Sequence, residues 1–287
     1  MNAPLSMDTS GPMAPRSGSL APIVVKIGGR ALEGGARAEL AREVATLAGR
    51  VVLVHGGGAE VTEWCARLGI EPRFHEGLRV TDEATLEVAT AVLGGLANKR
   101  WSALLAAHDV RAAGLCALDA GIADVAMHAQ SDVLGAVGDI LSIDAAPLLA
   151  LLDAGITPVL ASIGACDGAL VNINADHLAA AVAGALQTPV LVFLSDTPGL
   201  VLDGQLVPHL DPAGLTGAIT HPDVTGGMVP KLHAAQRALD LGARRVIIAA
   251  WNGPGTLTAL VQGTGAGTTL AGESTPAFDA ASIGGRT

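Results

Sequence analysis

Short apolar runs recur along the chain and alternate with segments in which apolar positions repeat every three or four residues. The runs are rich in Val, Ile and Leu and too short for typical helices, which favours buried strands. Strands are predicted for residues 23–27, 51–55, 157–163, 190–195 and 245–250. Near-continuous apolar strands joined by helices are typical of a mostly parallel sheet covered on both faces. The pattern therefore predicts an α/β fold.

The segments between these runs carry the helical period. Helices are predicted for residues 37–47, 60–68, 176–186 and 229–241. A longer helix is expected to follow Thr81-Asp82, with Thr81 as its N-cap, and to continue to His108. Glycines punctuate residues 113–141, so we expect hairpins there at one edge of the sheet.

Both ends of the chain lack such periodicity. Residues 1–21 mix Pro, Ser, Gly and Met, and residues 271–287 have a similar character. Segments of this composition bury too little apolar surface to offset the cost of ordering. Both are therefore predicted to be disordered tails.

The charge and hydropathy of the chain exclude two classes of partner. With 17 Lys and Arg against 27 Asp and Glu, the net charge is 17 − 27 = −10, whereas nucleic-acid binders need a basic face. The most apolar stretch, residues 179–194, is interrupted by Gln187 and Pro189 and is shorter than the roughly 20 residues of a membrane span. No leader pattern precedes the first strand. We expect a cytoplasmic protein without nucleic-acid or membrane partners.

Lysine is rare in this chain. Only Lys26, Lys99 and Lys231 are lysines, so 17 − 3 = 14 of the basic residues are arginines. A compact ammonium and a broad guanidinium are not interchangeable at a binding site. Each lysine is therefore a candidate for a specific role.

Two glycine clusters follow predicted strands. Lys26 lies two residues before the pair Gly28-Gly29, and His55 precedes Gly56-Gly57-Gly58. Glycines at the carboxyl end of a parallel strand allow a phosphate to approach the main chain, and an ammonium adds a charge beside it. A plain strand-to-helix turn, and a buried His55 bonded to backbone, are the alternative interpretations.

Polar residues gather at two further junctions. Arg79 lies in the segment Gly77-Leu78-Arg79-Val80-Thr81-Asp82, where its guanidinium is placed to hold a carboxylate, although a structural arginine is the alternative. Asn172-Ile173-Asn174-Ala175-Asp176 opens an Ala-rich helix. Asp176 is a possible N-cap, but one cap does not need three polar side chains.

Lys231 lies near the predicted start of another helix, in Gly226-Gly227-Met228-Val229-Pro230-Lys231. Pro230 suits a first helical turn. A cation at a helix N-terminus is disfavoured by a few tenths of a kcal/mol, and an anionic ligand there would reverse that sign. The placement of Lys231 therefore indicates phosphate binding.

These motifs, together with Leu194-Ser195-Asp196-Thr197-Pro198-Gly199, resemble the amino-acid kinase family, and within it the members that phosphorylate N-acetyl-L-glutamate. The resemblance covers about residues 23–270. It implies a three-layer αβα sandwich around a mainly parallel open sheet. Residues 22–187 would form the lobe that binds the acylated amino acid and carries a dimer helix, and residues 188–270 would form the ATP lobe.

The implied reaction transfers the γ-phosphoryl group of ATP to the side-chain carboxylate of N-acetyl-L-glutamate, a step of arginine biosynthesis. By resemblance, Lys26 and Lys231 flank the migrating phosphoryl group and Asp176 holds both lysines. The resemblance also implies that main-chain amides bind the phosphoryl group and the acceptor carboxylate, namely those of Gly28, Gly29, Gly56 and Gly57. The residues expected to bind the rest of the substrate are Arg79, Asn172 and Asn174.

The resemblance also implies a nucleotide site for ATP with Mg²⁺. Its expected residues are Ser195, Asp196, Gly226, Met228 and Thr268. Mg²⁺ would arrive as the ATP complex and keep several waters, so no protein cage for a metal is predicted.

The expected oligomeric state and substrate depend on features in which this chain differs from other members of the family. The resemblance implies an amphipathic N-terminal helix in arginine-inhibited members, and residues 1–21 do not have the periodicity of such a helix, so we expect a homodimer and no arginine-sensing hexamer. Arg30 departs from the small residue that is usual there, and Lys99 is expected at the surface or the dimer contact. The rival functions are a kinase for aminoadipate or glutamate blocked on a carrier protein, and a non-catalytic amino-acid or nucleotide sensor.

Overall fold

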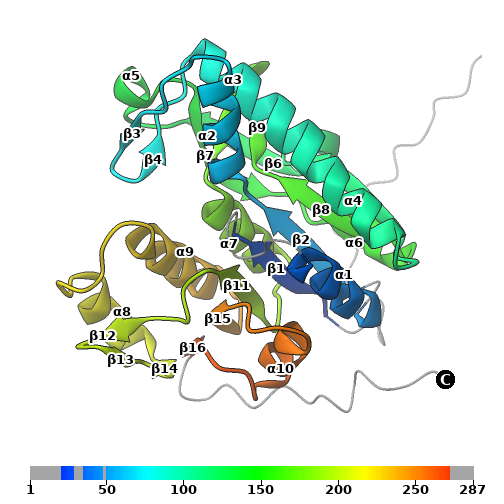
Figure 1. Ribbon diagram of the computed structural model, residues 1–287, viewed down its shortest axis with the longest axis vertical. Coiled ribbons are helices and arrows are strands. Elements are labelled where there is room, and N and C mark those ends of the chain that lie inside the picture. The colour runs from blue at the N-terminus through cyan, green and yellow to red at the C-terminus, as the bar shows by residue number, and fades with distance from the viewer. Residues whose placement is uncertain (1–20, 29–34, 48–49, 272–287) are drawn as a thin grey trace, which may run out of the picture.

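The computed structural model describes residues 21–28, 35–47 and 50–271. An eight-stranded sheet forms its centre (Figure 1). In spatial order the strands are β14 (His209–Leu210), β16 (Thr268–Ala271), β15 (Arg245–Ala250), β11 (Leu191–Ser195), β1 (Ile23–Ile27), β2 (Val51–His55), β8 (Thr157–Ala161) and β5 (Ala112–Cys116). All neighbours pair in parallel except β15 with β16. The predicted α/β class and mainly parallel sheet are confirmed.

Smaller strands form a second sheet and two hairpins. The second sheet contains β6 (Ala123–Met127), β7 (Val137–Ile143), β10 (Ala169–Ile173) and β9 (Ile163–Cys166), in that order. One hairpin joins β3 (Phe74–His75) to β4 (Leu78–Arg79), and the other joins β12 (Val201–Leu202) to β13 (Gln205–Leu206).

Helices cover both faces of the central sheet (Figure 1). They are α1 (Ala36–Thr46), α2 (Gly58–Arg67), α3 (Glu83–Ala89), the π-helix η1 (Thr90–Ala97), α4 (Asn98–Ala106), the 3₁₀ turn η2 (Asp119–Gly121), α5 (Ser131–Leu134), α6 (Ala146–Asp153), α7 (Ala175–Ala185), α8 (Pro212–Ile219), α9 (Met228–Asp240) and α10 (Thr256–Gln262). Among the described residues, every helix is too short or too polar to span a bilayer.

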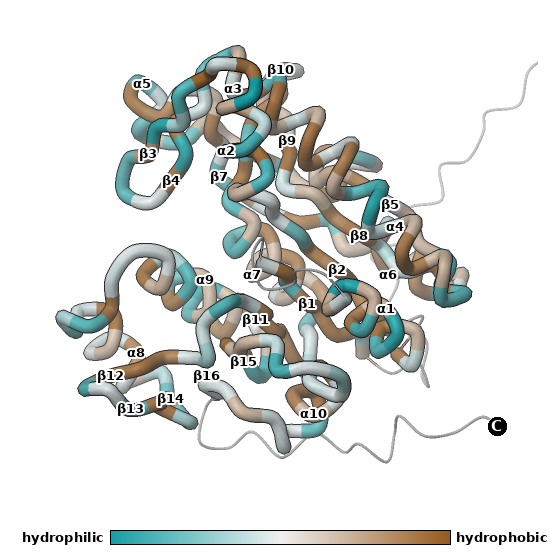
Figure 2. Tube along the Cα trace, in the orientation of Figure 1, coloured by the Kyte–Doolittle hydropathy of each residue, from teal (hydrophilic) through white to brown (hydrophobic). Residues whose placement is uncertain are grey.

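Alternation along β1 sends side chains into two separate cores. Val24 packs with residues of α7 and α9, whereas Val25 packs with residues of α1, α4 and α10. Figure 2 shows the hydrophobic residues along the central strands, with hydrophilic turns between elements. Because successive side chains of a strand point to opposite faces, Lys26 lies on the same face as Val24 and is directed toward α7.

The long helix after Asp82 differs from the prediction in two ways. Asp82, not Thr81, is the N-cap: its Oδ1 accepts the amide of Thr85 at 3.0 Å, while the hydroxyl of Thr81 donates to Arg79 O. The middle of the helix, η1, is π-helical. A π-helix bonds residue i to i+5 and so carries one extra residue per turn, which a 3.6-residue pattern does not reveal.

Three other predicted boundaries were wrong. Residues 157–163 contain all of β8 and the first residue of β9, and these two strands belong to different sheets. Residues 113–141 contain the hairpin β6–β7, but β5 is an edge strand of the central sheet and pairs in parallel with β8. Ala271 ends β16, and the rest of the two predicted tails lies outside the described residues, apart from Ala21.

A buried carboxylate connects α1 to the start of α10. Glu43 is 8% exposed, and it accepts hydrogen bonds from the amide of Gly255 at 2.8 Å and from the amide and hydroxyl of Thr258 at 2.9 and 3.1 Å. The first amides of a helix have no hydrogen-bond acceptor within the helix. Glu43 is the acceptor for two amides at the start of α10, although it lies far away in the sequence.

Substitution of Glu43 by Ala is therefore expected to lower the free energy of unfolding by about 1–3 kcal/mol, because it leaves buried donors unpaired. Glu43→Gln should cost less, since the amide oxygen still accepts one bond. Urea denaturation checks both, with Glu39→Ala as the control, because Glu39 of the same helix forms only a surface pair with Arg42. Equal stability of Glu43→Ala and Glu39→Ala would contradict the role of this contact.

Candidate active site

Three charged side chains from distant parts of the chain meet beside the central sheet. Lys26 comes from β1, Asp176 from the first turn of α7 and Lys231 from the first turn of α9. Lys26 Nζ lies 2.6 Å from Asp176 Oδ1, and Lys231 Nζ lies 3.2 Å from Asp176 Oδ2. Each of the three residues is 8% exposed. One carboxylate thus joins two ammonium groups, the juxtaposition that the resemblance implies.

The cluster keeps its charges although it is buried. Burial by itself would raise the pKa of the Asp176 carboxyl, but Lys26 and Lys231 outweigh it and lower that pKa to about 2. Burial and the charge of Lys26 lower the pKa of Lys231, and Asp176 opposes them. Two cations and one anion leave a net charge of +1, and buried charge needs compensation. An anionic ligand would supply it.

Local structure leaves the Asp176 carboxylate free for this contact. Asn174 is the N-cap of α7, and its Oδ1 accepts the amides of Asp176 at 2.8 Å and His177 at 3.2 Å. The interpretation of Asp176 as a cap is therefore wrong. Asn174 was expected to bind substrate. Its side-chain oxygen accepts the two capping hydrogen bonds instead, and the residue also lines the neighbouring cleft.

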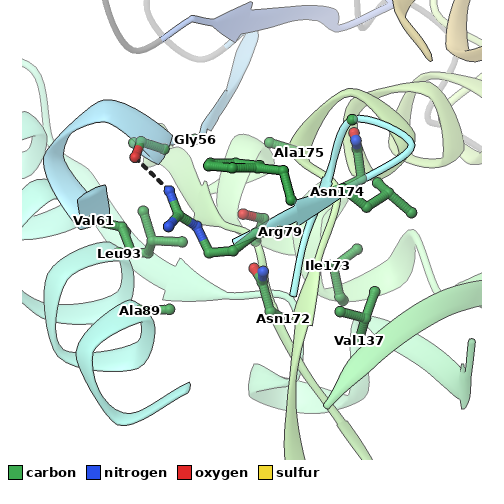
Figure 3. A pocket seen from close by; sticks show the side chains of 16 residues that line it. Gly56, Val61, Arg79, Ala89, Leu93, Val137, Asn172, Ile173, Asn174 and Ala175 are labelled. Carbon is green, nitrogen blue, oxygen red and sulfur yellow. Dashed lines mark hydrogen bonds between the residues drawn. The ribbon is translucent and has the colours of Figure 1, made fainter. Parts of the chain in front are cut away.

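A cleft of about 180 Å³ lies between the glycine loop after β2 and the β3–β4 hairpin (Figure 3). Its polar lining includes Gly56, Gly57, Arg79, Ser162 and Asn172, and its apolar lining includes Val61, Leu93 and Ile173. This volume is below the roughly 300–1,000 Å³ of pockets for drug-sized ligands. The cleft therefore suits a small metabolite. Ser162, at the break between β8 and β9, was not predicted as part of a site.

Arg79 is buried in the wall of this cleft with half of its guanidinium engaged. Its Nη2 donates to Gly58 O and Thr62 Oγ1, both at 2.7 Å, and the guanidinium lies 4.8 Å from the centre of the Phe74 ring. Its buried Nη1 has no hydrogen-bond partner among the described residues. Buried donors are almost always paired, so this atom indicates a ligand. Asn172 donates to Thr81 Oγ1 at 3.2 Å.

The main-chain amides of the glycine loops differ from expectation. The amide of Gly28 donates to Leu194 O at 2.8 Å, and that of Gly56 is directed to Ile27 O at 3.4 Å. Both hydrogen bonds continue the parallel ladder beyond the ends of the strands, so Gly28 is not a free donor for a phosphoryl group. Gly57 begins α2 as its N-cap residue. Gly29 and Arg30 lie outside the described residues.

The expected nucleotide residues lie at the end of β11, at the start of α9 and in β16, with different degrees of access. Ser195 ends β11 next to β1, and its hydroxyl is 2.9 Å from Thr197 Oγ1. Asp196 is exposed, and its charge acts on Lys231. Gly226, at φ +54°, precedes Met228 at the start of α9.

The side chain of Thr268, one of the expected nucleotide residues, is engaged within the fold. Its hydroxyl donates to Val207 O and accepts the amide of Leu200, both at 2.7 Å, and the residue is fully buried. The side chain therefore joins three segments of the fold. Lys99, as expected, is at the surface, where its Nζ donates to Gly114 O of β5 at 2.8 Å.

A profile of the amino acid kinase family matches residues 21–250. The chain belongs to the amino acid kinase family. Among its relatives in this family, the acetylglutamate kinase of Methanopyrus kandleri is 42% identical over 237 residues, which cover 78% of this chain and 93% of the relative. The acetylglutamate kinase of Koribacter versatilis is 40% identical over 232 residues, which cover 79% and 89%.

Solved structures of the family have the same fold. N-acetylglutamate synthase from Neisseria gonorrhoeae, complexed with coenzyme A and N-acetyl-glutamate, superposes with a TM-score of 0.77 at 28% identity. The match covers 88% of this chain but only 60% of the synthase chain. Carbamate kinase from Giardia lamblia bound to AMP-PNP superposes with a TM-score of 0.62 at 16% identity, over 89% of this chain and all of the other; this likeness concerns the fold alone.

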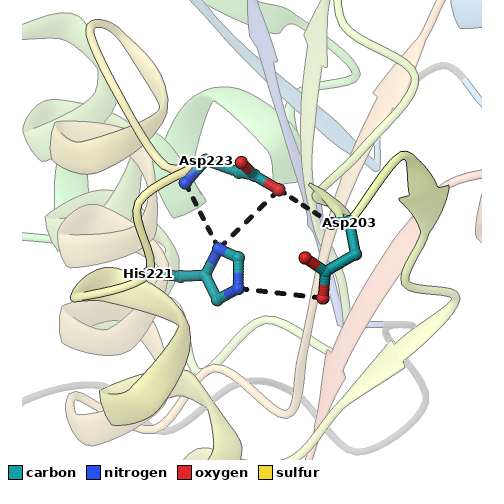
Figure 4. A group of neighbouring side chains, drawn as sticks. All are labelled: Asp203, His221 and Asp223. Atoms are coloured by element: carbon teal, nitrogen blue, oxygen red, sulfur yellow. Dashed lines mark hydrogen bonds and ion pairs between the residues drawn. The ribbon is translucent and has the colours of Figure 1, made fainter.

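A second group of polar side chains lies near the entry to α9 (Figure 4). Asp223 Oδ2 accepts the amide of Asp203 at 2.7 Å, and the amide of Asp223 donates to His221 Nδ1 at 3.2 Å. Since Nδ1 accepts, the neutral ring carries its proton on Nε2, which leaves no ring lone pair for a metal ion. The group connects the β12–β13 hairpin to the loop before α9.

The charge cluster predicts a defined pH dependence of stability. The folded pKa of Asp176 is about 2, below the ordinary value of about 3.9, so the charged carboxylate stabilises the fold above pH 4 and this contribution is lost as the pH falls toward 2. Urea denaturation of Asp176→Asn should therefore give a deficit of roughly 2 kcal/mol that stays constant from pH 8 to 5 and shrinks below pH 4.

The exposed Asp153 provides the control for this experiment, because Asp153→Asn removes a carboxylate outside the cluster and should leave stability nearly unchanged. A deficit of Asp176→Asn that already shrinks between pH 7 and 5 would contradict a carboxylate held ionised by two lysines.

Proposed function

We propose that this chain transfers the γ-phosphoryl group of ATP to the side-chain carboxylate of N-acetyl-L-glutamate, giving N-acetyl-L-glutamyl 5-phosphate in arginine biosynthesis. The observation that carries the proposal is the Asp176 carboxylate between Lys26 and Lys231, at 2.6 and 3.2 Å. The acetylglutamate kinases that are about 40% identical over most of the chain support the choice of substrate.

Phosphoryl transfer needs alignment and neutralisation of negative charge more than covalent help. A carboxylate oxygen of the acceptor attacks the γ-phosphorus, and the bond to the β-phosphate oxygen breaks as ADP leaves. Lys26 and Lys231 are placed to neutralise the charge that spreads over the transferred group. Asp176 holds the two ammonium groups about one carboxylate, so they need not reorganise during transfer.

The cleft beside Arg79 is the proposed site of the acceptor. The unpaired Nη1 of Arg79 suits the α-carboxylate, since arginine binds carboxylates with directed hydrogen bonds. The acylamino group would then lie near Asn172, with the apolar lining against the aliphatic chain. In this arrangement residues 22–187 form the acceptor lobe.

ATP is proposed to bind residues 188–270, around the ends of β11 and β15 and the start of α9. Ser195, Asp196, Gly226 and Met228 lie on this side, and Thr268 contributes through the main chain of its loop. Both oxygens of Asp176 contact lysines, so this carboxylate is not free for a metal. Mg²⁺ therefore enters as part of the substrate MgATP, held by phosphate oxygens and water.

Two other functions are less compatible with the site. A non-catalytic sensor has no need for two lysines held by one buried carboxylate. A carrier-bound amino acid would need a longer opening than the small cleft at Arg79 offers. We further propose a cytoplasmic homodimer, formed through the long helix α3–η1–α4, that is not inhibited by arginine.

A coupled ADP-release assay tests the proposed reaction. With saturating ATP we expect turnover of N-acetylglutamate and at least about 100-fold lower kcat/KM for free glutamate and carbamate, because these leave polar groups of the cleft unpaired. N-acetylaminoadipate should also turn over more slowly, by about 10–200-fold, because its extra methylene displaces the side-chain carboxylate. Arg79→Ala should raise KM for N-acetylglutamate at least about tenfold and leave KM for ATP unchanged, since one charged hydrogen-bonding group is lost.

The matched control is Arg73→Ala, which removes an exposed arginine from the same hairpin, where it pairs with Asp82. It should leave both KM values near those of the wild type. Preferred turnover of another acid, or no turnover at all, would overturn the proposed function.

A further inference from the structure

His55 is a buried histidine that the proposed chemistry has not used. It ends β2 directly before the glycine loop and is 1% exposed. Its Nδ1 lies 2.9 Å from Gly56 O, and its Nε2 lies 3.1 Å from Asn98 Nδ2. Both ring nitrogens are therefore engaged within the protein, and the ring itself does not bind a ligand.

Asn98 determines which ring nitrogen carries the proton. Asn98 Nδ2 also donates to Val159 O at 2.9 Å, and Asn98 Oδ1 accepts from Lys99 Nζ at 3.1 Å. Because a carbonyl can only accept and an ammonium can only donate, these partners fix the orientation of the Asn98 amide. Leu115 O also lies 3.3 Å from Asn98 Nδ2. Because an amide nitrogen cannot accept a hydrogen bond, the His55 Nε2 that faces it at 3.1 Å is unprotonated, and the ring proton is on Nδ1 and is donated to Gly56 O.

The ring stays in this neutral form over the working pH range. Burial lowers the pKa of His55 to about 4; the hydrogen bond to Gly56 opposes this, and the charges of Arg37 and Lys99 add to it. The long helix places Asn98 for this contact, since Asn98 is the first residue after the π-helical segment η1 and is fully buried. The extra residue per π-turn rotates the following face of the helix relative to an α-helix.

The bond to Gly56 fixes the orientation of the next amide. The described residues contain no cis peptide bond, and in a trans peptide the C=O of Gly56 and the N–H of Gly57 point in opposite directions. The loop lies between the cleft at Arg79 and a smaller cavity of about 30 Å³ lined by His55 and Trp101. With the carbonyl turned toward His55, the Gly57 amide points away from that ring, and Gly57 also lines the cleft at Arg79.

We propose that His55 is a positioning residue for phosphoryl transfer: its Nδ1–H holds the Gly56–Gly57 peptide so that the Gly57 amide donates to the reacting oxygens, and Asn98 fixes the required tautomer. The inference rests on the proposed function. A Cβ at Gly57 would lie 2.7 Å from Leu93 Cδ2, so a larger residue there would have to displace the end of that side chain. Gly57 was one of the four glycines expected to donate, and in this inference it keeps that role, whereas the amide of Gly28 is bonded to Leu194 O.

Two substitutions of His55 separate positioning from packing. The amide nitrogen of Asn can take the place of Nδ1 and still donate to Gly56 O, whereas the longer Gln can only replace Nε2 and its bond to Asn98. Loss of one preorganised donor slows related reactions by about 10²–10³-fold. We expect kcat of His55→Gln to fall at least about tenfold with KM for ATP and N-acetylglutamate nearly unchanged, and His55→Asn to recover most of it.

His209→Gln, the same substitution at an exposed histidine, is the control, and thermal melting of each variant measures stability separately. Equal loss of kcat in His55→Asn and His55→Gln, or wild-type kcat in His55→Gln, would overturn the positioning role. Turnover by the wild type tests the proposed function independently, so the two failures are distinguishable.

A ¹H–¹⁵N correlation spectrum of the labelled wild-type protein tests the tautomer directly and does not depend on how the variants fold. We expect a protonated Nδ1 and an unprotonated Nε2 for His55 from pH 8 to 5.5. A proton on Nε2 would overturn the inference even if the enzyme is active.

Discussion

The structure depends on one buried carboxylate shared by two lysines. Asp176 brings together β1, α7 and α9, which lie far apart in the sequence, and it fixes the distance between the two cations. Without it, two like charges would face each other in a poorly hydrated site, at a cost that grows as the local dielectric falls. The remaining net charge of +1 favours an anion in the space that they enclose. Both the stability of the fold and phosphoryl transfer therefore require an ionised carboxylate at Asp176 between the two lysines.

Ordinary rules of strand alternation and helix capping position Lys26 and Asp176 for this contact. Lys26 faces α7 because it alternates with Val25 along β1, and Asp176 is free because Asn174 takes over the capping of α7. Parallel strands end at the same edge of the sheet, so the carboxyl ends of β1, β2 and β11 lie together there, as is general for ligand sites in such sheets. Arg79 reaches this edge from the β3–β4 hairpin and supports the glycine loop through Gly58 O. The site is thus assembled from strand ends and helix starts, and its precision comes from the rigid elements behind them.

Much of this could be predicted from the sequence, because the signals are local. Five strands of the central sheet, β1, β2, β8, β11 and β15, are continuous apolar runs, whereas β5, β14 and β16 are not and were missed. Lys26 and Lys231 are two of only three lysines in a chain that otherwise uses arginine. What could not be predicted depends on contacts across the fold. The amide of Gly28 is used by Leu194, the hydroxyl of Thr268 joins distant loops, and Glu43 caps α10 from the opposite end of the chain. The π-helical segment and the pairing of His55 with Asn98 likewise arise from tertiary packing, which periodicity does not encode.

The central claim is that Asp176 holds the lysines for the transition state more than for the ground state. Two affinities are measured by calorimetric titration of the wild type and of Asp176→Asn, each with N-acetylglutamate present. The first is for the complex of ADP and aluminium fluoride, which mimics the transferring phosphoryl group, and the second is for the ATP analogue AMP-PNP. Transition-state interactions are lost selectively when preorganisation is removed. The account predicts at least about tenfold weaker binding of the aluminium fluoride complex and less than about threefold weaker binding of AMP-PNP. An equal loss for both ligands, or no loss for either, would contradict it.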